Sequence, residues 1–445
     1  MEKNKNCINV SDSNPAIVKE NALCTDCGHC RAVCMEEINV AGHTIPGREN
    51  EKFCIHCGQC AAACPEQAIQ VKKELGGVKA AIRDPKKIVV FSTSPSVRVG
   101  IGDEFLEKSG VYSEGKMVAA LRKLGGDYVL DVTFSADLTI MEEGSELLER
   151  IVKQDKALPQ FTSCCPAWVK YVETYHPDLI PNLSTAKSPI GMQGAVIKTY
   201  FATKHHLNPE DIVSVAVTPC TAKKFEIRRP ELEDAGKLLG ISGMRDNDFV
   251  ITTKELVQWM KEEGIDFNAL EEESFDCILG KGSGAGVIFG NTGGVMEAAL
   301  RMAYECLTGE SPKEALLHFE PVRGMQGIKE ASVQIGDVTV NTAVVYGTAN
   351  AEKLLNGDLS KYHFIEVMTC PGGCIAGAGQ PQRNEIPPSK QTRLNRISSM
   401  YQEDARMELR NSIDNPEIGT IYHEFLKEPL SEMSEQLLHT SYYKR

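Results

Sequence analysis

Two runs of four cysteines constrain the fold of this chain more than any other feature of its sequence. Residues 24–34 read CTDCGHCRAVC and residues 54–64 read CIHCGQCAAAC, so both runs share the spacing C-x2-C-x2-C-x3-C. The whole chain holds 16 cysteines. In a reducing compartment, such regular spacing indicates metal ligation rather than disulfide bonds.

The spacing of the two runs is typical of cubic iron–sulfur clusters. Three closely spaced thiolates can wrap one face of a cube, and in two-cluster ferredoxins the fourth cysteine of each run binds the other cluster. A zinc site would instead pair two C-x2-C knuckles across a longer gap, often with histidine. His29 and His56 lie inside the runs, and we expect them to be exposed spacers. We predict two 4Fe-4S clusters, one held by Cys24, Cys27, Cys30 and Cys64 and the other by Cys54, Cys57, Cys60 and Cys34.

Composition and charge narrow the class of protein. The chain has 445 residues, 42% of them hydrophobic, which leaves room for roughly two to four globular domains. Its net charge of -13 argues against general nucleic-acid binding, which needs a basic surface. No apolar run approaches the length of a membrane span, and the polar N-terminus lacks the apolar core of a secretory signal. We therefore expect a cytoplasmic protein without nucleic-acid or membrane partners.

The sequence after the cysteine runs alternates between strand and helix signals. Short β-branched runs indicate strands at residues 87–93, 127–133, 211–218, 248–253 and 363–369. Between them, stretches such as MEEGSELLERIVKQ have apolar residues at helical spacing. This alternation predicts an α/β body with ligands at the carboxyl ends of its strands. The segment from about residue 384 has a helical, charged pattern, and we expect it to wrap that body.

Further cysteines fall where predicted strands end. Cys220 follows one strand, Cys370 and Cys374 follow another in the turn TCPGGCIAGAGQP, and Cys165 precedes a helix in FTSCCPAW. Four thiolates that converge at one crevice would hold one more cube, and the glycines around Cys374 indicate backbone that passes close to a bulky inorganic group. Cys164 needs a separate explanation, because the side chains of adjacent cysteines diverge. Burial as plain thiols is the alternative, and we expect it for Cys7, Cys277 and Cys306.

Three of these segments together resemble the cluster-binding signatures of the iron–iron (FeFe) hydrogenases. TSCCPAW resembles the first signature, TPCTAKKFE the second and EVMTCPGGCIAGAGQP the third. The resemblance implies an α+β ferredoxin-like N-terminal domain, a larger α/β H-cluster domain with two lobes of sheets flanked by helices, and a helical C-terminal segment similar to the small subunit of that family. We place these parts at residues 19–84, 85–383 and 384–445, after an N-terminal tail at residues 1–18.

The same resemblance implies the make-up of the catalytic centre. Cys165, Cys220, Cys370 and Cys374 would hold the cube of the H-cluster, and Cys374 would also bridge to a two-iron subcluster that carries carbon monoxide, cyanide and azadithiolate ligands. Cys164 would pass protons to and from the bridging amine instead of binding metal. Splitting hydrogen requires such a base beside the metal, and a thiol suits it because its pKa shifts readily.

A buried proton also needs a route to solvent, and the resemblance implies one. Relays in the family include two glutamates, a serine and an arginine, which match Glu143, Glu146, Ser184 and Arg150. Residues 143, 146 and 150 share one helix face, for which an ordinary charged surface is the alternative interpretation. Lys223 would direct its ammonium at a cyanide ligand and anchor an anionic cofactor. Positions that match the family's pocket around the two-iron unit are held by Pro95, Ser96, Phe289 and Met368. Glu226 would lie in the layer behind these residues.

Several residues depart from the best-known members of the family. They are Ser94, Ala167, Ile190, Thr218, Ala376 and Ala378. All line or neighbour the expected two-iron pocket, so they should alter hydrogen bonding to its ligands and hence redox potential, catalytic bias and oxygen sensitivity. On these departures the chain resembles a less-studied subgroup.

The resemblance implies a redox enzyme that interconverts hydrogen with protons and electrons. Electrons would pass through the two N-terminal clusters to or from a ferredoxin or flavodoxin, and maturation enzymes would supply the two-iron unit. A hydrogen sensor is an alternative, although sensor relatives usually change the proton-transfer cysteine and add signalling domains. An iron–sulfur assembly factor is another, although those relatives lack intact TSCCP and PCTAKK signatures.

Overall fold

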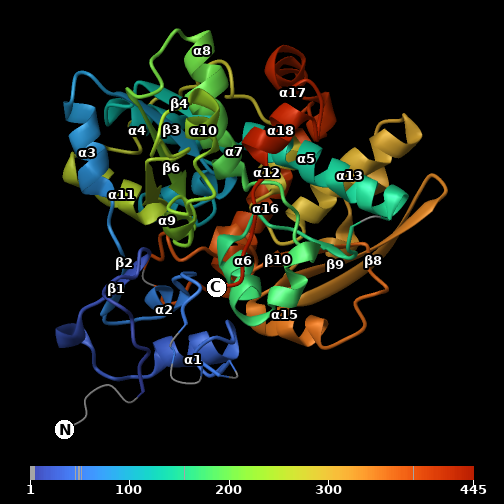
Figure 1. Cartoon of the computed structure of the whole chain (residues 1–445). Helices are drawn as coiled ribbons and strands as arrows, with labels where there is room; N and C mark the ends of the chain where they lie inside the picture. Colours follow the sequence, from blue (N-terminus) through green and yellow to red (C-terminus); the bar gives the residue numbers. More distant parts are fainter. Residues whose placement is uncertain (1–5, 46, 49–50, 52, 155, 384) are drawn as a thin grey trace.

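The chain forms a small cysteine-rich unit and a larger body that contains two separate sheets (Figure 1). In this computed structural model the described residues are 6–45, 47–48, 51, 53–154, 156–383 and 385–445. The start of the predicted N-terminal tail lies outside the described residues, as does residue 384, where the C-terminal segment is predicted to begin.

The cysteine-rich unit is built from one short antiparallel pair and two short helices. Strands β1 (Ile17–Lys19) and β2 (Ile69–Val71) pair with each other, and α1 (His29–Glu36) and α2 (Gln59–Ala62) each carry part of one cysteine run. Each helix starts directly after a glycine in the left-handed region, Gly28 at φ 87° and Gly58 at φ 72°. A left-handed residue is easiest for glycine, and here it turns the backbone around each set of cysteines.

The first lobe of the body has an all-parallel sheet in the order β4-β3-β6-β7. Side chains alternate between its two faces: Val89 and Phe91 pack under α4 and α11, whereas Val90 packs toward α5. Both faces are therefore covered, as a parallel sheet requires. The strands are β3 (Ile88–Thr93), β4 (Tyr128–Asp131), β6 (Ile212–Thr218) and β7 (Phe249–Thr252), and the helices around them are α3 (Leu75–Arg83), α4 (Glu114–Lys123), α5 (Val132–Lys153), α7 (Pro189–Val196) and α11 (Thr253–Glu262).

The second lobe has a mixed sheet in the order β5-β10-β9-β8, in which only β8 runs antiparallel to its neighbour. Trp168 and Ala351 belong to the core on one face of this sheet, and Val295 belongs to the core on the other. The elements are β5 (Gln160–Phe161), β8 (Ile328–Ile335), β9 (Val338–Tyr346), β10 (Phe364–Met368), α6 (Pro166–Tyr175), α13 (Gly294–Thr308) and α15 (Thr348–Leu355). Short helices complete the body at α8 (Ala202–Lys204), α9 (Lys223–Glu226), α10 (Asp234–Leu239), α12 (Gly284–Ile288) and α14 (Glu314–Leu317).

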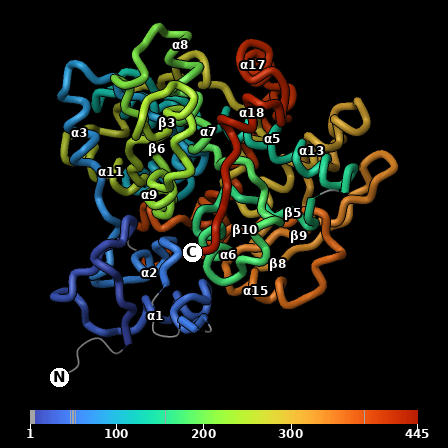
Figure 2. The backbone as a smooth tube through the Cα atoms, viewed as in Figure 1, coloured from blue at the N-terminus to red at the C-terminus, as the bar shows by residue number. Residues whose placement is uncertain are grey.

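The C-terminal segment wraps the body and ends beside the cysteine-rich unit. Its helices are α16 (Lys390–Arg406), α17 (Pro416–Ile421) and α18 (Glu432–Leu438). Figure 2 shows the chain running down from α18 to a C-terminus near α6 and α2. There the backbone oxygen of Arg445 accepts a hydrogen bond from Arg48 at 3.0 Å.

The predicted fold class is confirmed, with small differences at element ends. Each of the five predicted strand segments contains a strand. The helix predicted from MEEGSELLERIVKQ begins earlier, at Val132, because the Asp131 side chain accepts a hydrogen bond from the Thr133 backbone N–H and caps it. In the C-terminal segment, for which a helical pattern is predicted from about residue 384, α16 ends at Arg406 and an irregular stretch follows it. Within the described residues, no helix has both the length and the apolar character needed to cross a membrane.

Candidate iron–sulfur and catalytic site

The two cysteine runs line two cavities of the N-terminal unit. One cavity is lined by the four cysteines predicted for the first cluster, and the other by the four predicted for the second. Cys7 lines both cavities. We call them the outer cluster site (Cys24, Cys27, Cys30 and Cys64) and the inner cluster site (Cys34, Cys54, Cys57 and Cys60).

The burial of the thiols fits a metal cluster at the inner cluster site. Burial, and then neighbouring cysteines, raise the pKa of Cys57 and Cys60 well above its usual value. Cys54 helps to raise the pKa of Cys34, whose larger cause is again burial. Thiolates that are buried and repel one another need a cationic group between them. Since the fourth cysteine of each run lines the cavity of the other run, the donor sets match two cubes with exchanged fourth ligands.

The remaining predicted ligands come from loops of both lobes. Cys165 directly precedes α6, Cys220 follows β6, and Cys370 and Cys374 follow β10. Burial, followed by repulsion from Cys220, Cys165 and Cys374, raises the pKa of Cys370 well above its usual value. The four thiols therefore lie close enough to interact, and we call this set the catalytic cube site.

The inner cluster site and the catalytic cube site are directly joined. Thr221, next to Cys220, donates its hydroxyl to the backbone oxygen of His56 at 2.9 Å. The Gln59 amide donates to the backbone oxygen of Ala376 at 3.1 Å. A Cβ at Gly58 would lie 2.5 Å from the Thr221 hydroxyl, so glycine allows the two loops to meet. Charge on Cys57 also acts on Cys370, so the two sites lie within short electron-transfer reach of each other.

Close backbone contacts hold the Cys374 loop. Gly373 has φ 100°, and a Cβ there would lie 2.6 Å from the Thr292 backbone nitrogen. A Cβ at Gly377 would lie 2.4 Å from the Pro219 oxygen. The two glycines thus press this loop against residues 290–292 on one side and against the Cys220 loop on the other. These glycines therefore allow close contact between backbone segments, and the bulky inorganic group predicted beside them stays a prediction.

The predicted pocket residues are buried, and one of them has an unused polar atom. Pro95 and Ser96 begin a short helix directly after β3 and Ser94, Phe289 directly follows α12, and Met368 ends β10. The Ser96 hydroxyl is buried without a hydrogen-bond partner among the described residues. A buried hydroxyl normally has a hydrogen-bond partner. The missing partner of Ser96 is therefore consistent with a bound group that offers a polar atom.

Cys164 lies between the catalytic cube site and the predicted proton relay. It is half-buried near Glu143, Cys165 and Cys374, and desolvation is the main cause that raises its pKa well above its usual value. Neither carboxyl oxygen of Glu143 accepts a hydrogen bond of standard geometry among the described residues. Burial, and then Glu146, raise the pKa of Glu143 to about 8. A carboxyl group with this pKa holds a proton near neutral pH and can pass it on.

The other predicted relay residues form a continuous hydrogen-bonded chain. Glu146 accepts from the Ser184 hydroxyl at 2.9 Å and from the Arg150 guanidinium at 2.8 Å. Arg150 is itself buried and also donates to backbone oxygens, including that of Leu183 at 2.9 Å. A fully buried arrangement argues against an ordinary charged helix face, which would lie in solvent. The structure therefore brings all five predicted proton-transfer residues together.

Lys223 lies beside Cys164 rather than in open solvent. Its ammonium pairs with Glu226 at 2.8 Å and donates to the backbone oxygen of Cys164 at 3.0 Å. Its positive charge acts on Cys164, Cys220 and Cys374. A buried cation held in this way can anchor an anionic group.

The residues that depart from the family pattern are all buried. Thr218 accepts a hydrogen bond from the Cys220 backbone N–H at 3.3 Å, so this change touches the loop of a predicted ligand. The Ala378 side chain lies where a Cβ at Gly58 would point, at the junction of the inner cluster site and the body. The full set of buried departures is Ser94, Ala167, Ile190, Thr218, Ala376 and Ala378.

Some expectations for isolated residues are wrong. His56 is buried, with 6% exposure, because the ring of Phe225 of the body packs against it with the centroids 4.6 Å apart; His29 is exposed as expected. Cys277 and Cys306 are exposed instead of buried. Cys7 is buried as expected, and it has a charged neighbour, because the Lys19 ammonium lies 2.8 Å from its sulfur.

The C-terminal tail supplies polar groups that the sequence did not indicate. His439 contacts Glu142 at 3.1 Å and Thr185 at 2.8 Å, and the Thr185 backbone N–H donates to Glu146 at 3.0 Å. A single histidine far along the chain has no spacing pattern that would link it to these residues. The isolated strand pairing of Ala186 with His439 creates the contact.

Comparison with protein families accounts for nearly the whole chain. A family model described as "Iron only hydrogenase large subunit, C-terminal domain" matches residues 87–378. A model described as "Iron hydrogenase small subunit" matches residues 390–445, and one described as "4Fe-4S dicluster domain" matches residues 16–74.

Individual proteins agree with these matches. The NADP-reducing hydrogenase subunit HndD of Solidesulfovibrio fructosivorans is 43% identical over 96% of this chain and 67% of its own length. Iron hydrogenase 1 of Clostridium pasteurianum is 40% identical over 98% of this chain and 77% of its own length. Cytosolic iron-sulfur assembly component 3 of Bos taurus is 32% identical over 84% of this chain and 78% of its own length. A solved structure of an apo FeFe-hydrogenase HydA1 variant from Chlamydomonas reinhardtii has a TM-score of 0.72 at 38% identity, and covers 84% of this chain and 99% of that one.

Proposed function

Because the chain belongs to the iron-only hydrogenase family, we propose that it catalyses the reversible interconversion of hydrogen with protons and electrons. Its domains are those of a hydrogenase-family oxidoreductase with 4Fe-4S clusters and an H-cluster. The observation that supports this activity most strongly is the position of Cys164. Its thiol lies between the predicted cluster ligands and a buried carboxyl group that leads to a hydrogen-bonded relay.

The catalytic cube site would hold the cube of the H-cluster through Cys165, Cys220, Cys370 and Cys374. The cofactor supplies the redox chemistry of hydrogen, and the chain supplies the path of the proton. The Cys164 thiol would hold the proton beside the cofactor and exchange it with the Glu143 carboxyl group. The Ser184 hydroxyl and the Glu146 carboxylate continue the path, and the Arg150 guanidinium holds Glu146 in place.

Lys223 and the pocket residues have a binding function in this proposal. The Lys223 ammonium, fixed by Glu226, would attract the anionic ligands of the two-iron unit. The Ser96 hydroxyl would donate to a ligand of the same unit, since the described residues leave it unused. Pro95, Phe289 and Met368 would enclose the unit and exclude water.

The first test is the infrared spectrum of the chain produced anaerobically with the maturation enzymes. We expect bands of metal-bound carbon monoxide and cyanide, together with hydrogen turnover driven by reduced ferredoxin. Bands without turnover would favour a hydrogen sensor. Iron for three cubes with no such bands would favour an assembly factor, the function named for the relative from Bos taurus.

The second test is the Cys164→Ala variant, matured in the same way. The proton path would be broken at its first atom, so we expect turnover to fall by at least about a hundredfold, while the carbon monoxide and cyanide bands persist. Cys306→Ala is a matched control, because this thiol is exposed and far from the site along α13. Near-normal turnover in Cys164→Ala would remove the thiol from the mechanism.

The electron partner is a separate part of the proposal. We propose a ferredoxin or flavodoxin that exchanges electrons at the outer cluster site, where Cys27 is exposed. The 43% identity to a subunit of an NADP-reducing hydrogenase supports a second candidate, in which another subunit passes electrons from NADPH. Turnover of the purified chain with reduced ferredoxin, but not with NADPH alone, would agree with both. Stimulation of NADPH-dependent turnover by a co-purified subunit would favour the second.

A further inference from the structure

A hydrogen-bonded chain of three side chains connects the body to a sulfur of the inner cluster site. Lys170 lies in the second turn of α6, the helix that directly follows Cys165. Its ammonium nitrogen lies 2.7 Å from Nε2 of His56. His56 Nδ1 lies 3.2 Å from Oδ1 of Asn14, and Nδ2 of Asn14 donates to the Cys54 sulfur at 3.4 Å.

The contacts assign the direction of every hydrogen bond in this chain. Oδ1 of Asn14 also accepts from the backbone N–H groups of Ala16 and Ile17, which fixes the amide with its NH2 group toward Cys54. His56 must then donate from Nδ1, so its Nε2 carries a lone pair. An ammonium can only donate, and Lys170 donates to that lone pair. The positive charge of Lys170 is therefore linked to the cluster sulfur through two polarised side chains.

Lys170 has no carboxylate partner among the described residues. Among the ion pairs of the described residues none involves Lys170, whereas the neighbouring Glu173 is paired with Arg229 at 2.6 Å and with Arg445 at 3.2 Å. Lys170 is partly buried and rests on the ring of Phe225, 4.4 Å from its centroid. Burial lowers the pKa of Lys170, and the charge of Cys54 is the main cause that acts against this shift. A cation in such a place needs a compensating negative charge.

We propose that Lys170, acting through His56 and Asn14, raises the reduction potential of the 4Fe-4S cluster held by Cys34, Cys54, Cys57 and Cys60. The cluster with its four thiolates is the negative charge that Lys170 compensates. Reduction adds one more negative charge to the cluster, and a fixed cation stabilises the reduced form more than the oxidised form. Lys170 is a positioning residue for electron transfer, because it touches neither substrate nor ligand sulfur directly. The inference rests on the assignment of the cluster ligands and does not depend on hydrogen turnover.

The test is a potentiometric titration of the full chain, followed by electron paramagnetic resonance. In Lys170→Met the ratio of reduced to oxidised inner cluster at a fixed potential should fall on the order of tenfold, as Coulomb's law gives for unit charges about 10 Å apart at an effective dielectric constant of about 20. For a one-electron couple this equals a shift of about 59 mV to lower potential. The outer cluster should shift much less.

Three further variants separate charge from hydrogen bonding and from folding. Lys170→Gln keeps a donor for His56 but loses the charge, so it should behave like Lys170→Met. Lys170→Arg keeps the charge and should stay near the wild type. Lys198→Met is the matched control, because it removes a buried lysine of the first lobe that pairs with Asp248 at 2.9 Å and lies outside the described residues that line the two N-terminal cluster sites; it should leave both potentials unchanged.

Iron content and unchanged resonance line shapes would show that both clusters are intact in each variant. The proposal is overturned if Lys170→Met and Lys170→Gln titrate like the wild type. It is also overturned if the outer cluster shifts as far as the inner one, or if Lys198→Met shifts the inner cluster equally, since the effect would then reflect overall charge. Absence of hydrogen turnover in all samples would count against the proposed function but would leave these potentials interpretable.

Discussion

At the scale of single residues, Glu143 carries the most unusual environment of the proposed proton path. Its carboxyl group is buried, lies near Glu146 and has few partners, and burial raises its pKa to about 8. In the unfolded chain this pKa returns to about 4.3. The folded state therefore binds this proton more tightly, and the associated stability is present at low pH and is lost as pH rises toward 8.

The Glu143→Gln variant should remove this dependence. We expect the melting temperature of the variant to rise relative to the wild type as pH increases from 6 to 9, by the equivalent of a few kcal/mol at most. Anaerobic thermal unfolding measured over this range would check it. Glu149→Gln on the same helix is the control, since Glu149 is partly exposed and its ion pair among the described residues is with Lys153. Parallel curves for wild type and Glu143→Gln would show that Glu143 is ionised in the folded state.

Single residues also show what sequence reasoning can reach. The cluster cysteines are predictable because their local spacing reflects the shape of a cube. His56 lies inside the same run, yet it is buried, because Phe225 and Lys170 from the body cover it. No property of residues 54–60 indicates that a distant helix will lie on that side. A local pattern can therefore explain why a residue such as His56 belongs to a motif, whereas its burial depends on contacts from another part of the chain.

At the scale of elements, the strands of the first lobe were predicted from the sequence, whereas β5, β8 and β9 of the second lobe were not. β-Branched runs marked each strand of the first lobe, because such residues suit a buried sheet. In DYVLDVT the same residues concealed the end of the strand, and the helix begins at Val132 because Asp131 caps it. Positions of the loops after the strands, which carry the site, follow from the parallel order β4-β3-β6-β7.

The loop after β10 provides a test at this scale. Gly373→Ala would place a Cβ 2.6 Å from the Thr292 nitrogen and 2.8 Å from the Gly290 oxygen, both backbone atoms that cannot easily move. We expect displacement of the Cys374 loop and loss of one cluster's iron from the purified protein. Gly309→Ala has a similar positive φ of 69° but no atom within 4 Å of the new Cβ. It should keep its iron and cost only about 1–2 kcal/mol. Full iron content in Gly373→Ala would contradict the account of this loop.

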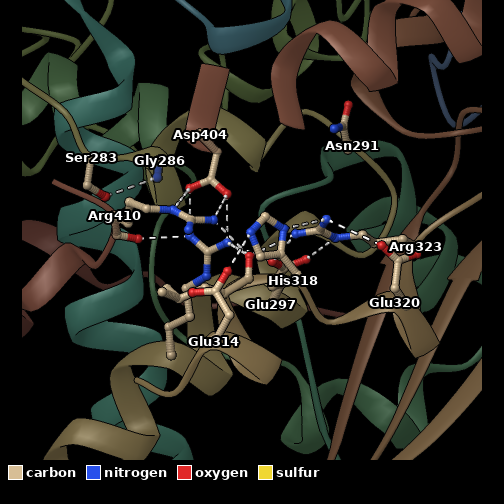
Figure 3. Close-up of polar contacts among 12 residues, drawn as sticks. Ser283, Gly286, Asn291, Glu297, Glu314, His318, Glu320, Arg323, Asp404 and Arg410 are labelled. Carbon is tan, nitrogen blue, oxygen red and sulfur yellow. Dashed lines mark hydrogen bonds and ion pairs between the residues drawn. The ribbon is translucent and has the colours of Figure 1, made fainter. Parts of the chain in front are cut away.

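At the scale of the whole molecule, the C-terminal segment joins parts that the sheets leave separate. Its helix α16 lies against α12 and against the short helix that begins at Pro95. The last residue of the segment, Arg445, pairs with Glu173 on α6. A buried group of charges fastens it to α13 of the second lobe, as Figure 3 shows around Asp404. Asp404 accepts from Arg301 at 2.8 Å and from Arg410 at 2.9 Å, and Arg301 also pairs with Glu297 at 2.6 Å.

Asp404 therefore provides the test of whether the segment holds the molecule together. Although burial acts to raise it, Arg301 and then Arg410 lower the pKa of Asp404, so the carboxylate is charged in the folded state. Asp404→Asn would leave the buried Arg301 with less compensation, and removing one partner of a buried pair costs about 3–5 kcal/mol. The control is Glu330→Gln, whose pair with Lys361 is about half exposed, at 52% and 54% of the two side chains; it should cost about 0–1 kcal/mol.

Because the segment contacts both lobes, Asp404→Asn should also speed proteolytic cleavage near residue 384 and loss of iron from the catalytic cube site, while the two N-terminal clusters stay intact. Equal loss from all three sites would mean that the charge group stabilises the chain only as a whole, and unchanged cleavage would show that the apolar contacts of α16 suffice to hold the segment.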